Sequence, residues 1–214
     1  MTPKTILFDF DGTIADTLQR FIEIADILAK KYHFQQLNIS KITEFKNHTL
    51  LDLALNHFKI PWYKIPFIIF DFKKLLAESS HKTELFPEIK NILLKLKLCG
   101  FRLGLLTSSP TKSVEIVLEK FRLSNFFEFV TTNASIYHKE KNIQKMINKY
   151  HLNKSDLYYV GDEVRDLRAC RKLSIVCVSV SWGFSSRELL QKENPEVILD
   201  EPGEILGWFR VNDV

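Results

Sequence analysis

Short apolar runs alternate along most of this chain with longer segments of helical period. The runs have the length and residue types of buried strands, and turn residues follow them. They are Thr5–Phe10, Arg102–Thr107, Phe129–Thr131, Leu157–Val160, Ile175–Val180 and Val197–Leu199. The segments between them repeat apolar residues at spacings of three and four, at Glu88–Leu98, Thr111–Phe121, Asn142–Tyr150 and Val164–Leu173. This alternation predicts βαβ units and therefore an α/β fold, with helices on both faces of a parallel sheet.

One long region, from Asp16 to about Thr83, breaks the alternation because no convincing strand interrupts it. Its apolar spacing predicts helices instead, at Thr17–Tyr32, Thr49–Phe58 and Lys64–Glu78. A chain of 214 residues is long for one compact domain and short for two. We therefore predict a discontinuous α/β core, residues 1–14 and 85–214, interrupted by a helical cap of residues 15–84. Hinges are expected near residues 14–17 and 83–87.

The composition excludes several other classes of protein. Hydrophobic residues make up 45% and charged residues 26%, which is typical of a globular chain rather than a disordered one. The 30 basic and 26 acidic residues are spread along the chain, so we expect no nucleic-acid partner. No run reaches the roughly 18 apolar residues of a membrane span. Three cysteines without a CxxC pair argue against a disulfide framework or a zinc site. With a strand pattern starting at Thr5 and no room for a signal peptide, these features predict a cytoplasmic protein.

The first chemical motif follows the first apolar run. Asp9 and Asp11 are two residues apart, so in an extended chain their carboxylates point to the same side. Two such carboxylates repel unless a cation lies between them, and oxygen ligands of this kind suit Mg²⁺. Gly12 permits a sharp turn and close approach of a ligand. The alternative is a plain turn with an acid at its edge.

A second acidic group ends a later strand pattern at Gly161-Asp-Glu-Val-Arg-Asp166. Asp162 closes the strand, and the spacing of four places Asp166 on the same face of the helix that follows. The alternative is an N-capping Asp with acids at the positive end of the helix dipole. If the two strands are neighbours, four carboxylates would gather at one place.

Two further elements are candidates for phosphate binding. Thr107 and Ser108 close a strand and precede a helix, where a hydroxyl and free backbone N–H groups can cradle a phosphate. The competing interpretation is a Ser N-cap followed by Pro110 at the first helical position. Lys139 opens the helix before the second acidic group and could neutralise phosphate charge. There the alternative is a solvated run of charges.

Taken together, these four elements resemble the haloacid dehalogenase superfamily. Leu7-Phe-Asp-Phe-Asp-Gly-Thr-Ile is similar to its first motif, Thr107 to the second, a lysine near 139 to the third and Gly161–Asp166 to the fourth. The order matches from Ile6 to about Leu206. The helical insertion and the segment Ser181-Trp-Gly-Phe-Ser-Ser-Arg187 resemble the phosphoglycolate-phosphatase-like subgroup. The resemblance implies a Rossmann-like sheet of order 5-4-1-2-3, with ligands bound beyond the carboxyl ends of the strands.

The resemblance also implies roles for individual residues. Asp9 would be the nucleophile that forms an aspartyl-phosphate, and Asp11 the general acid and then the base. Mg²⁺ would lie among Asp9, the main-chain carbonyl of Asp11 and Asp162. The remaining roles are phosphate binding and support of the site, implied for Thr107, Ser108, Lys139, Asp166 and Gly12.

Several functions are compatible with these motifs. The leading hypothesis is a Mg²⁺-dependent phosphatase acting on a small phosphorylated metabolite, a phosphoglycolate-like monoester. The acid at position 11 favours phosphoryl chemistry, because dehalogenating members lack it. The alternatives are a phosphotransferase of the β-phosphoglucomutase type and a non-catalytic phosphate-binding protein. The subgroup often has Lys-Pro as its third motif where this chain has Lys139-Glu-Lys141, so Lys141 is a second candidate. We expect a small-molecule partner, no membrane, and a monomer or homodimer.

Overall fold

The computed structural model describes residues 3–36, 45–49, 52–135 and 138–211. Eight strands lie within these ranges: β1 (Thr5–Phe8), β2 (Ala15–Asp16), β3 (Glu84–Leu85), β4 (Arg102–Leu106), β5 (Phe129–Thr131), β6 (Leu157–Gly161), β7 (Val176–Val180) and β8 (Val197–Leu199). The α-helices are α1 (Leu18–Tyr32), α4 (Ile65–Ser79), α5 (Ile89–Leu98), α6 (Thr111–Lys120), α7 (Lys139–Tyr150), α8 (Val164–Leu173), α9 (Arg187–Gln191) and α10 (Glu204–Trp208).

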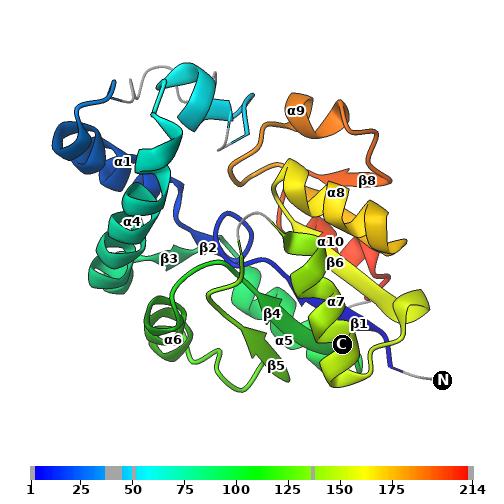
Figure 1. Ribbon diagram of the computed structural model, residues 1–214. Coiled ribbons are helices and arrows are strands. Elements are labelled where there is room, and N and C mark those ends of the chain that lie inside the picture. The colour runs from blue at the N-terminus through cyan, green and yellow to red at the C-terminus, as the bar shows by residue number, and fades with distance from the viewer. Residues whose placement is uncertain (1–2, 37–44, 50–51, 136–137, 212–214) are drawn as a thin grey trace.

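Six of the strands form one parallel sheet in the order β5-β4-β1-β6-β7-β8. The predicted order 5-4-1-2-3 corresponds to β7-β6-β1-β4-β5 in these labels. The observed sheet differs from it by a sixth strand, β8, which lies beside β7 and was left out of the predicted order. In this register Phe8 faces Leu105 on one side and Val160 on the other. The carboxyl ends of β1, β4 and β6 consequently lie side by side at one edge of the sheet (Figure 1).

Helices cover both faces of the sheet, as the apolar patterns predicted. Alternate residues of β1 belong to different core clusters: Ile6 and Phe8 pack with apolar residues of α5, α6 and α10. Leu7 packs on the opposite face with α7 and α8. This is the burial expected of a central parallel strand, whose side chains enter the core on both faces. Both faces of the sheet are therefore covered by helices, and the ends of the strands are where reacting side chains can lie.

The inserted region forms a separate layer of helices beside the sheet edge (Figure 1). Helices α1 and α4 pack on each other through a small apolar cluster that includes Ile24, Leu28 and Leu76. Of the predicted helix at 49–58, residues 50–51 lie outside the described part. The described remainder contains η2, a short π-helix at Leu53–His57. Short 3-10 turns follow at η3 (Trp62–Lys64) and η4 (Ser80–Lys82), and a third, η5 (Lys154–Asp156), precedes β6.

A two-stranded antiparallel sheet joins the ends of the inserted region. Ala15 pairs with Leu85, and Asp16 pairs with Glu84. The sequence did not predict these strands, because two residues are too few to show a period. The chain therefore leaves and re-enters the neighbourhood of β1 at adjacent points. Within the described residues, no helix has the length and apolar character needed to cross a bilayer.

Candidate active site

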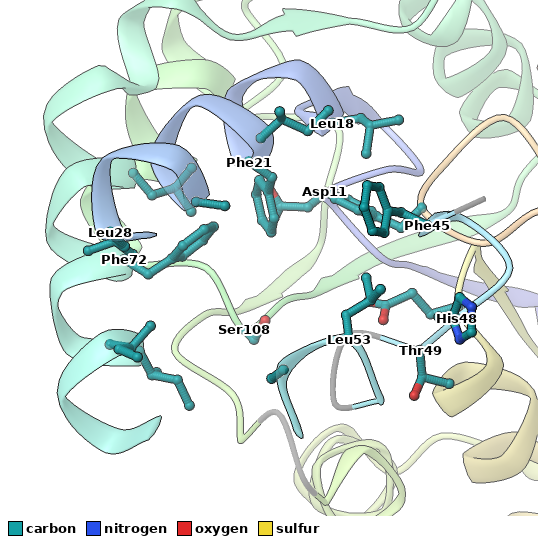
Figure 2. A pocket seen from close by; sticks show the side chains of 18 of the residues that line it. Asp11, Leu18, Phe21, Leu28, Phe45, His48, Thr49, Leu53, Phe72 and Ser108 are labelled. Atoms are coloured by element: carbon teal, nitrogen blue, oxygen red, sulfur yellow. The ribbon is translucent and has the colours of Figure 1, made fainter. Parts of the chain in front are cut away.

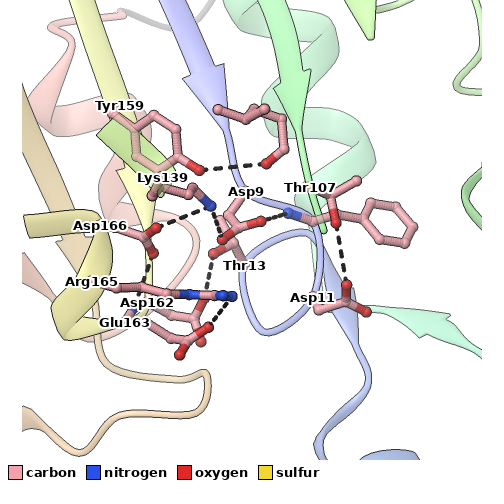
Figure 3. A network of polar contacts seen from close by, with 12 residues as sticks. Asp9, Asp11, Thr13, Thr107, Lys139, Tyr159, Asp162, Glu163, Arg165 and Asp166 are labelled. Carbon is pink, nitrogen blue, oxygen red and sulfur yellow. Dashed lines mark hydrogen bonds and ion pairs between the residues drawn. The ribbon is translucent and has the colours of Figure 1, made fainter. Parts of the chain in front are cut away.

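Three buried carboxylates meet at the carboxyl ends of β1 and β6 (Figure 3). Asp9 directly follows β1, and its main-chain N–H donates to the carbonyl of Val160 on β6, 2.9 Å away. Asp162 follows β6, and Asp166 lies in the first turn of α8. Each of these three residues offers a carboxylate oxygen, and these oxygens all lie within 4.8 Å of one another. The sheet topology thus brings together acids that are about 150 residues apart in sequence.

Lys139 neutralises part of this charge. Its Nζ lies 2.6 Å from Oδ2 of Asp9 and 3.0 Å from Oδ1 of Asp166, with only 5% of its side chain exposed. Burial disfavours the ammonium, but the Asp166 and Asp9 carboxylates outweigh burial and raise the pKa of Lys139. Lys141 is exposed. Of the two candidate lysines, Lys139 is therefore the one at the carboxylates.

Asp162 is fixed from two sides by the core. Thr13 Oγ1 donates to its Oδ1 at 2.8 Å, and the main-chain N–H of Phe184 donates to its Oδ2 at 2.7 Å. A methyl group on Gly12 or on Gly183 would overlap Oδ2 of Asp162. Gly12 also has a φ of +75°, a conformation that other residues rarely adopt. The two glycines therefore let the chain close tightly around this carboxylate.

Asp11 lies apart from the three clustered carboxylates. Its Oδ2 accepts a hydrogen bond of 2.5 Å from Ser109 Oγ and a longer one of 3.4 Å from Thr107 Oγ1. We expected the Asp9 and Asp11 carboxylates to lie together, but β1 ends at Phe8. Residues 9 to 11 therefore belong to a turn, where the alternation of an extended strand no longer holds. Among the described residues, the group that could share an ion does not include the Asp11 carboxylate.

The environment of Asp11 favours its protonated form. Burial raises the pKa of Asp11 to about 6; the Ser109 hydrogen bond opposes this shift and the nearby Asp9 charge adds to it. Thr107 and Ser109 are both nearly fully buried beside it. A carboxyl group with this pKa exchanges a proton near neutral pH, as a general acid and base must.

The helix-capping alternatives are only partly correct. Helix α8 is capped by Glu163 rather than by Asp162, and the main-chain N–H of Glu163 donates to Oδ2 of Asp166. Asp166 therefore both caps the helix and binds Lys139. At α6, Pro110 is the N-cap and no side chain caps the helix. The hydroxyl groups that precede α6 therefore form hydrogen bonds with other partners, one of which is Asp11.

The donor set fits a magnesium ion. Burial and the neighbouring carboxylates raise the pKa of Asp162 well above its usual range, and burial also raises that of Asp166 despite the Lys139 charge. Burial is the first cause of both shifts, and repulsion among the crowded carboxylates adds to it. A small divalent cation bound by carboxylate oxygens relieves such repulsion, and Mg²⁺ has this preference. Asp9 and Asp162 would hold it, with Asp166 beside them.

Two charged residues that sequence reasoning passed over also belong to this site. Arg165 forms an ion pair of 2.5 Å with Glu163, and both line the same cavity as Asp9 and Asp11. Ser108 lies on the wall of this cavity as well. The signal for Arg165 was present, because it lies inside the second acidic motif. Only the packing of α8 shows that its guanidinium turns toward the carboxylates (Figure 3).

The comparisons with known proteins agree with this geometry. The family model described as haloacid dehalogenase-like hydrolase matches residues 6–180. A phosphoglycolate phosphatase of Synechococcus elongatus is 25% identical over 203 residues, which cover 95% of each chain. The pyrophosphatase PpaX of Bacillus mycoides is 26% identical over 212 residues, which cover 96% of each. Both relatives therefore match nearly the whole of this chain, including the inserted helices.

A solved structure supports the fold. The crystal structure of a predicted phosphatase from Clostridium acetobutylicum superposes with a TM-score of 0.85 at 21% identity. The alignment covers 98% of this chain and 99% of that one. The sheet and the inserted helical layer are therefore shared as one arrangement.

Proposed function

The chain belongs to the haloacid dehalogenase-like hydrolases, and we propose that it is a Mg²⁺-dependent phosphatase that hydrolyses a small phosphorylated metabolite through an aspartyl-phosphate. The observation that carries this proposal is the separation of two acids at one cavity. Asp9 forms a buried ion pair with Lys139, whereas Asp11 has a pKa of about 6 and can hold a proton. A nucleophile and a proton donor are the two groups that cleavage of a phosphomonoester requires.

In the first step, a carboxylate oxygen of Asp9 attacks phosphorus and the bond from phosphorus to the ester oxygen breaks. That oxygen takes the proton of Asp11 and departs as an alcohol. In the second step, the Asp11 carboxylate takes a proton from water as the water oxygen attacks phosphorus. The bond between Asp9 and phosphorus then breaks, which releases inorganic phosphate and restores both acids.

The phosphoryl group needs positive charge and hydrogen-bond donors around it during both steps. Lys139 lies beside Asp9, Thr107 and Ser108 directly follow β4, and Ser108 lies on the cavity wall. We assign these three residues to phosphate binding. When bound, Mg²⁺ supplies further positive charge at the phosphoryl oxygens. Asp9, Asp162 and the main-chain carbonyl of Asp11 would hold the ion, with Asp166 and Gly12 supporting the site.

The matched relatives support a small phosphate compound as substrate, since one is a phosphoglycolate phosphatase and another a pyrophosphatase. The resemblance found in the sequence predicts a phosphoglycolate-like monoester as one such compound. The division into a core of residues 1–14 and 85–214 and a cap of residues 15–84 is part of the same proposal. It is supported by the β2–β3 pairing at the two ends of the cap. A cytoplasmic location and a monomer or homodimer remain predictions.

The decisive experiment compares the wild-type protein with Asp9→Asn in a panel of phosphomonoesters, with and without Mg²⁺. Asn has the volume of Asp but no nucleophilic oxygen, so phosphate release should fall roughly 10⁴-fold with the fold intact. Chelation of Mg²⁺ should abolish release by the wild-type protein. The matched control is Asp200→Asn, at a surface carboxylate paired with Arg187, which should retain full activity.

The alternatives give different results in the same panel. Isomerisation of a hexose phosphate faster than phosphate release would indicate the phosphotransferase. Absence of release from every ester, together with tight phosphate binding, would indicate the non-catalytic protein. Undiminished turnover by Asp9→Asn would overturn the proposed mechanism.

A further inference from the structure

A single cavity of about 320 Å³ joins the carboxylate site to the inserted helices (Figure 2). Asp9, Asp11 and Ser108 lie on its wall, so the cavity reaches the reacting groups. This volume lies within the range of roughly 300–1,000 Å³ that is common for small-molecule sites. The phosphoryl group would occupy only the part beside Asp9, and the remaining space must receive the leaving group.

The rest of the wall is mostly apolar. Helix α1 contributes Leu18, Phe21 and Leu28, and helix α4 contributes Ile68 and Phe72. Figure 2 shows these aromatic and aliphatic side chains of α1 and α4 around the space onto which Asp11 and Ser108 face. Phe45 and Leu53, from the segment between the two helices, extend the apolar lining. A leaving group in this space would be surrounded mainly by hydrocarbon.

Most polar residues on this wall already have partners within the protein. His48 Nδ1 lies 2.5 Å from Asp52, and Thr49 Oγ1 accepts a hydrogen bond from the main-chain N–H of Asp52. Lys46 Nζ donates to the carbonyl of Ser181. Lys73, half-buried on α4, is a further lysine on this wall. A neutral polar leaving group would lose its hydration against the largely apolar remainder of the wall, which is unfavourable.

We propose that the substrate is a phosphomonoester whose leaving group is an extended apolar chain or ring, bound between α1 and α4. This inference rests on the proposed function and makes its substrate class specific. It departs from a short, acidic, phosphoglycolate-like ester. The apolar wall then contributes affinity in proportion to the hydrocarbon it removes from water, at about four-fold per methylene.

The test is a series of n-alkyl phosphates from ethyl to octyl, below their aggregation concentrations, with phosphoglycolate as the comparison substrate. The value of kcat/KM should rise about four-fold per methylene until the cavity is full. Octyl phosphate should exceed phosphoglycolate by more than ten-fold. A flat or falling series, or a preference for phosphoglycolate, would overturn the inference.

A pair of variants on α1 tests whether the preference for long alkyl chains arises at the cavity wall. Ala25 lines the cavity on α1, and Ala25→Phe would fill part of it. The ratio of kcat/KM for octyl phosphate to that for ethyl phosphate should fall about 16-fold, because the space for roughly two methylenes is lost. Ile27→Phe adds a ring of the same kind on the exposed side of the same helix, where Ile27 is 51% exposed. The Ile27→Phe variant should keep the wild-type ratio of kcat/KM for octyl phosphate to that for ethyl phosphate. The wild-type alkyl series decides the question even if Ala25→Phe does not fold.

Binding of n-alkyl phosphonates separates this inference from the proposed function, because phosphonates have no ester bond to hydrolyse. Calorimetry on the wild-type protein with Mg²⁺ should show affinity that increases with chain length. If that increase appears without turnover of any ester, the proposal of phosphatase activity is wrong and the proposal of an apolar binding site is supported. If affinity does not depend on chain length, the apolar site is wrong whether or not the protein is a phosphatase.

Discussion

The two ends of the cavity are built by opposite physical means. At the sheet edge, buried charges hold each other in place: Lys139 bridges Asp9 and Asp166, and both oxygens of Asp162 accept hydrogen bonds. Between α1 and α4 the buried contacts come from aromatic and aliphatic side chains, and the polar contacts of Asp71 with Lys31 and Tyr32 lie outside this apolar cluster. Charged contacts are directional and costly to break, whereas apolar contacts depend mainly on area and shape.

This difference suggests a division of tasks. The sheet edge positions reacting atoms, where an error of an ångström is costly. The helical layer needs only to exclude water and to fit the leaving group. Substitutions at the sheet edge should therefore affect both catalysis and stability. Substitutions in the helical layer should affect mainly substrate preference.

After Asp9→Asn, the largest effect should come from Lys139→Met. The change leaves Asp9 and Asp166 buried without their common cation, and loss of one partner of a buried ion pair destabilises by about 3–5 kcal/mol. Phosphate release should fall at least about 100-fold, since charge at the phosphoryl group is lost as well. Denaturant unfolding and steady-state kinetics measure the two effects. Lys141→Met, at the exposed neighbour, is the matched control and should match the wild type in both; equal losses in the two variants would contradict the assignment.

The pH profile should reveal the proton held by Asp11. Its pKa of about 6 means that the protonated fraction falls about ten-fold per pH unit above that value. An alkyl phosphate needs this proton on its leaving oxygen, but 4-nitrophenyl phosphate does not, because nitrophenolate departs unprotonated. The kcat/KM for the alkyl phosphate, divided by that for 4-nitrophenyl phosphate, should therefore fall as pH rises above about 6. Asp11→Asn should remove this dependence, and a pH-independent ratio in the wild type would argue against Asp11 as the acid.

A smaller effect is expected from Gly183→Ala. The new methyl group would overlap Oδ2 of Asp162 and the main-chain oxygen of Gly12. Displacing a metal-holding carboxylate lowers metal affinity by about ten-fold or more. The Mg²⁺ concentration for half-maximal activity should rise accordingly. Gly207→Ala is the control, because nothing lies within 4 Å of its added carbon. An unchanged Mg²⁺ requirement in Gly183→Ala would indicate that Asp162 does not hold the ion.

The smallest effect should come from the apolar end. The Phe21 ring lies 4.7 Å from that of Phe72 and 4.6 Å from that of Phe184, centroid to centroid, so it joins the helical layer to the core. Phe21→Leu should lower the free energy of unfolding by about 1 kcal/mol and reduce the preference for long alkyl phosphates. Phe67→Leu, on an exposed side of α4, should change stability by less than about 0.5 kcal/mol. A loss of turnover on all esters in Phe21→Leu would break the proposed division of tasks.

Much of the fold could be predicted from the sequence because its strands and helices have clear periods. Helix α8 begins and ends at the predicted residues, and β5 and β8 match their predicted bounds. The predictions failed where the signal is short or depends on distant residues. The two-residue strands β2 and β3 are examples, since their pairing joins residues about 70 positions apart.

The sequence by itself determined which residue types stand at the strand ends: Asp9 and Asp11 after the first strand, Asp162 after a later one, and a lysine near position 139. Local periodicity and turn chemistry are sufficient for that, because they act over a few residues. Only the tertiary structure decided that Lys139 rather than Lys141 reaches Asp9 and that Asp11 turns to Ser109. It also decided that the helical layer presents a hydrocarbon wall to the site. These outcomes depend on how separate elements pack, and no local pattern in the chain encodes that packing.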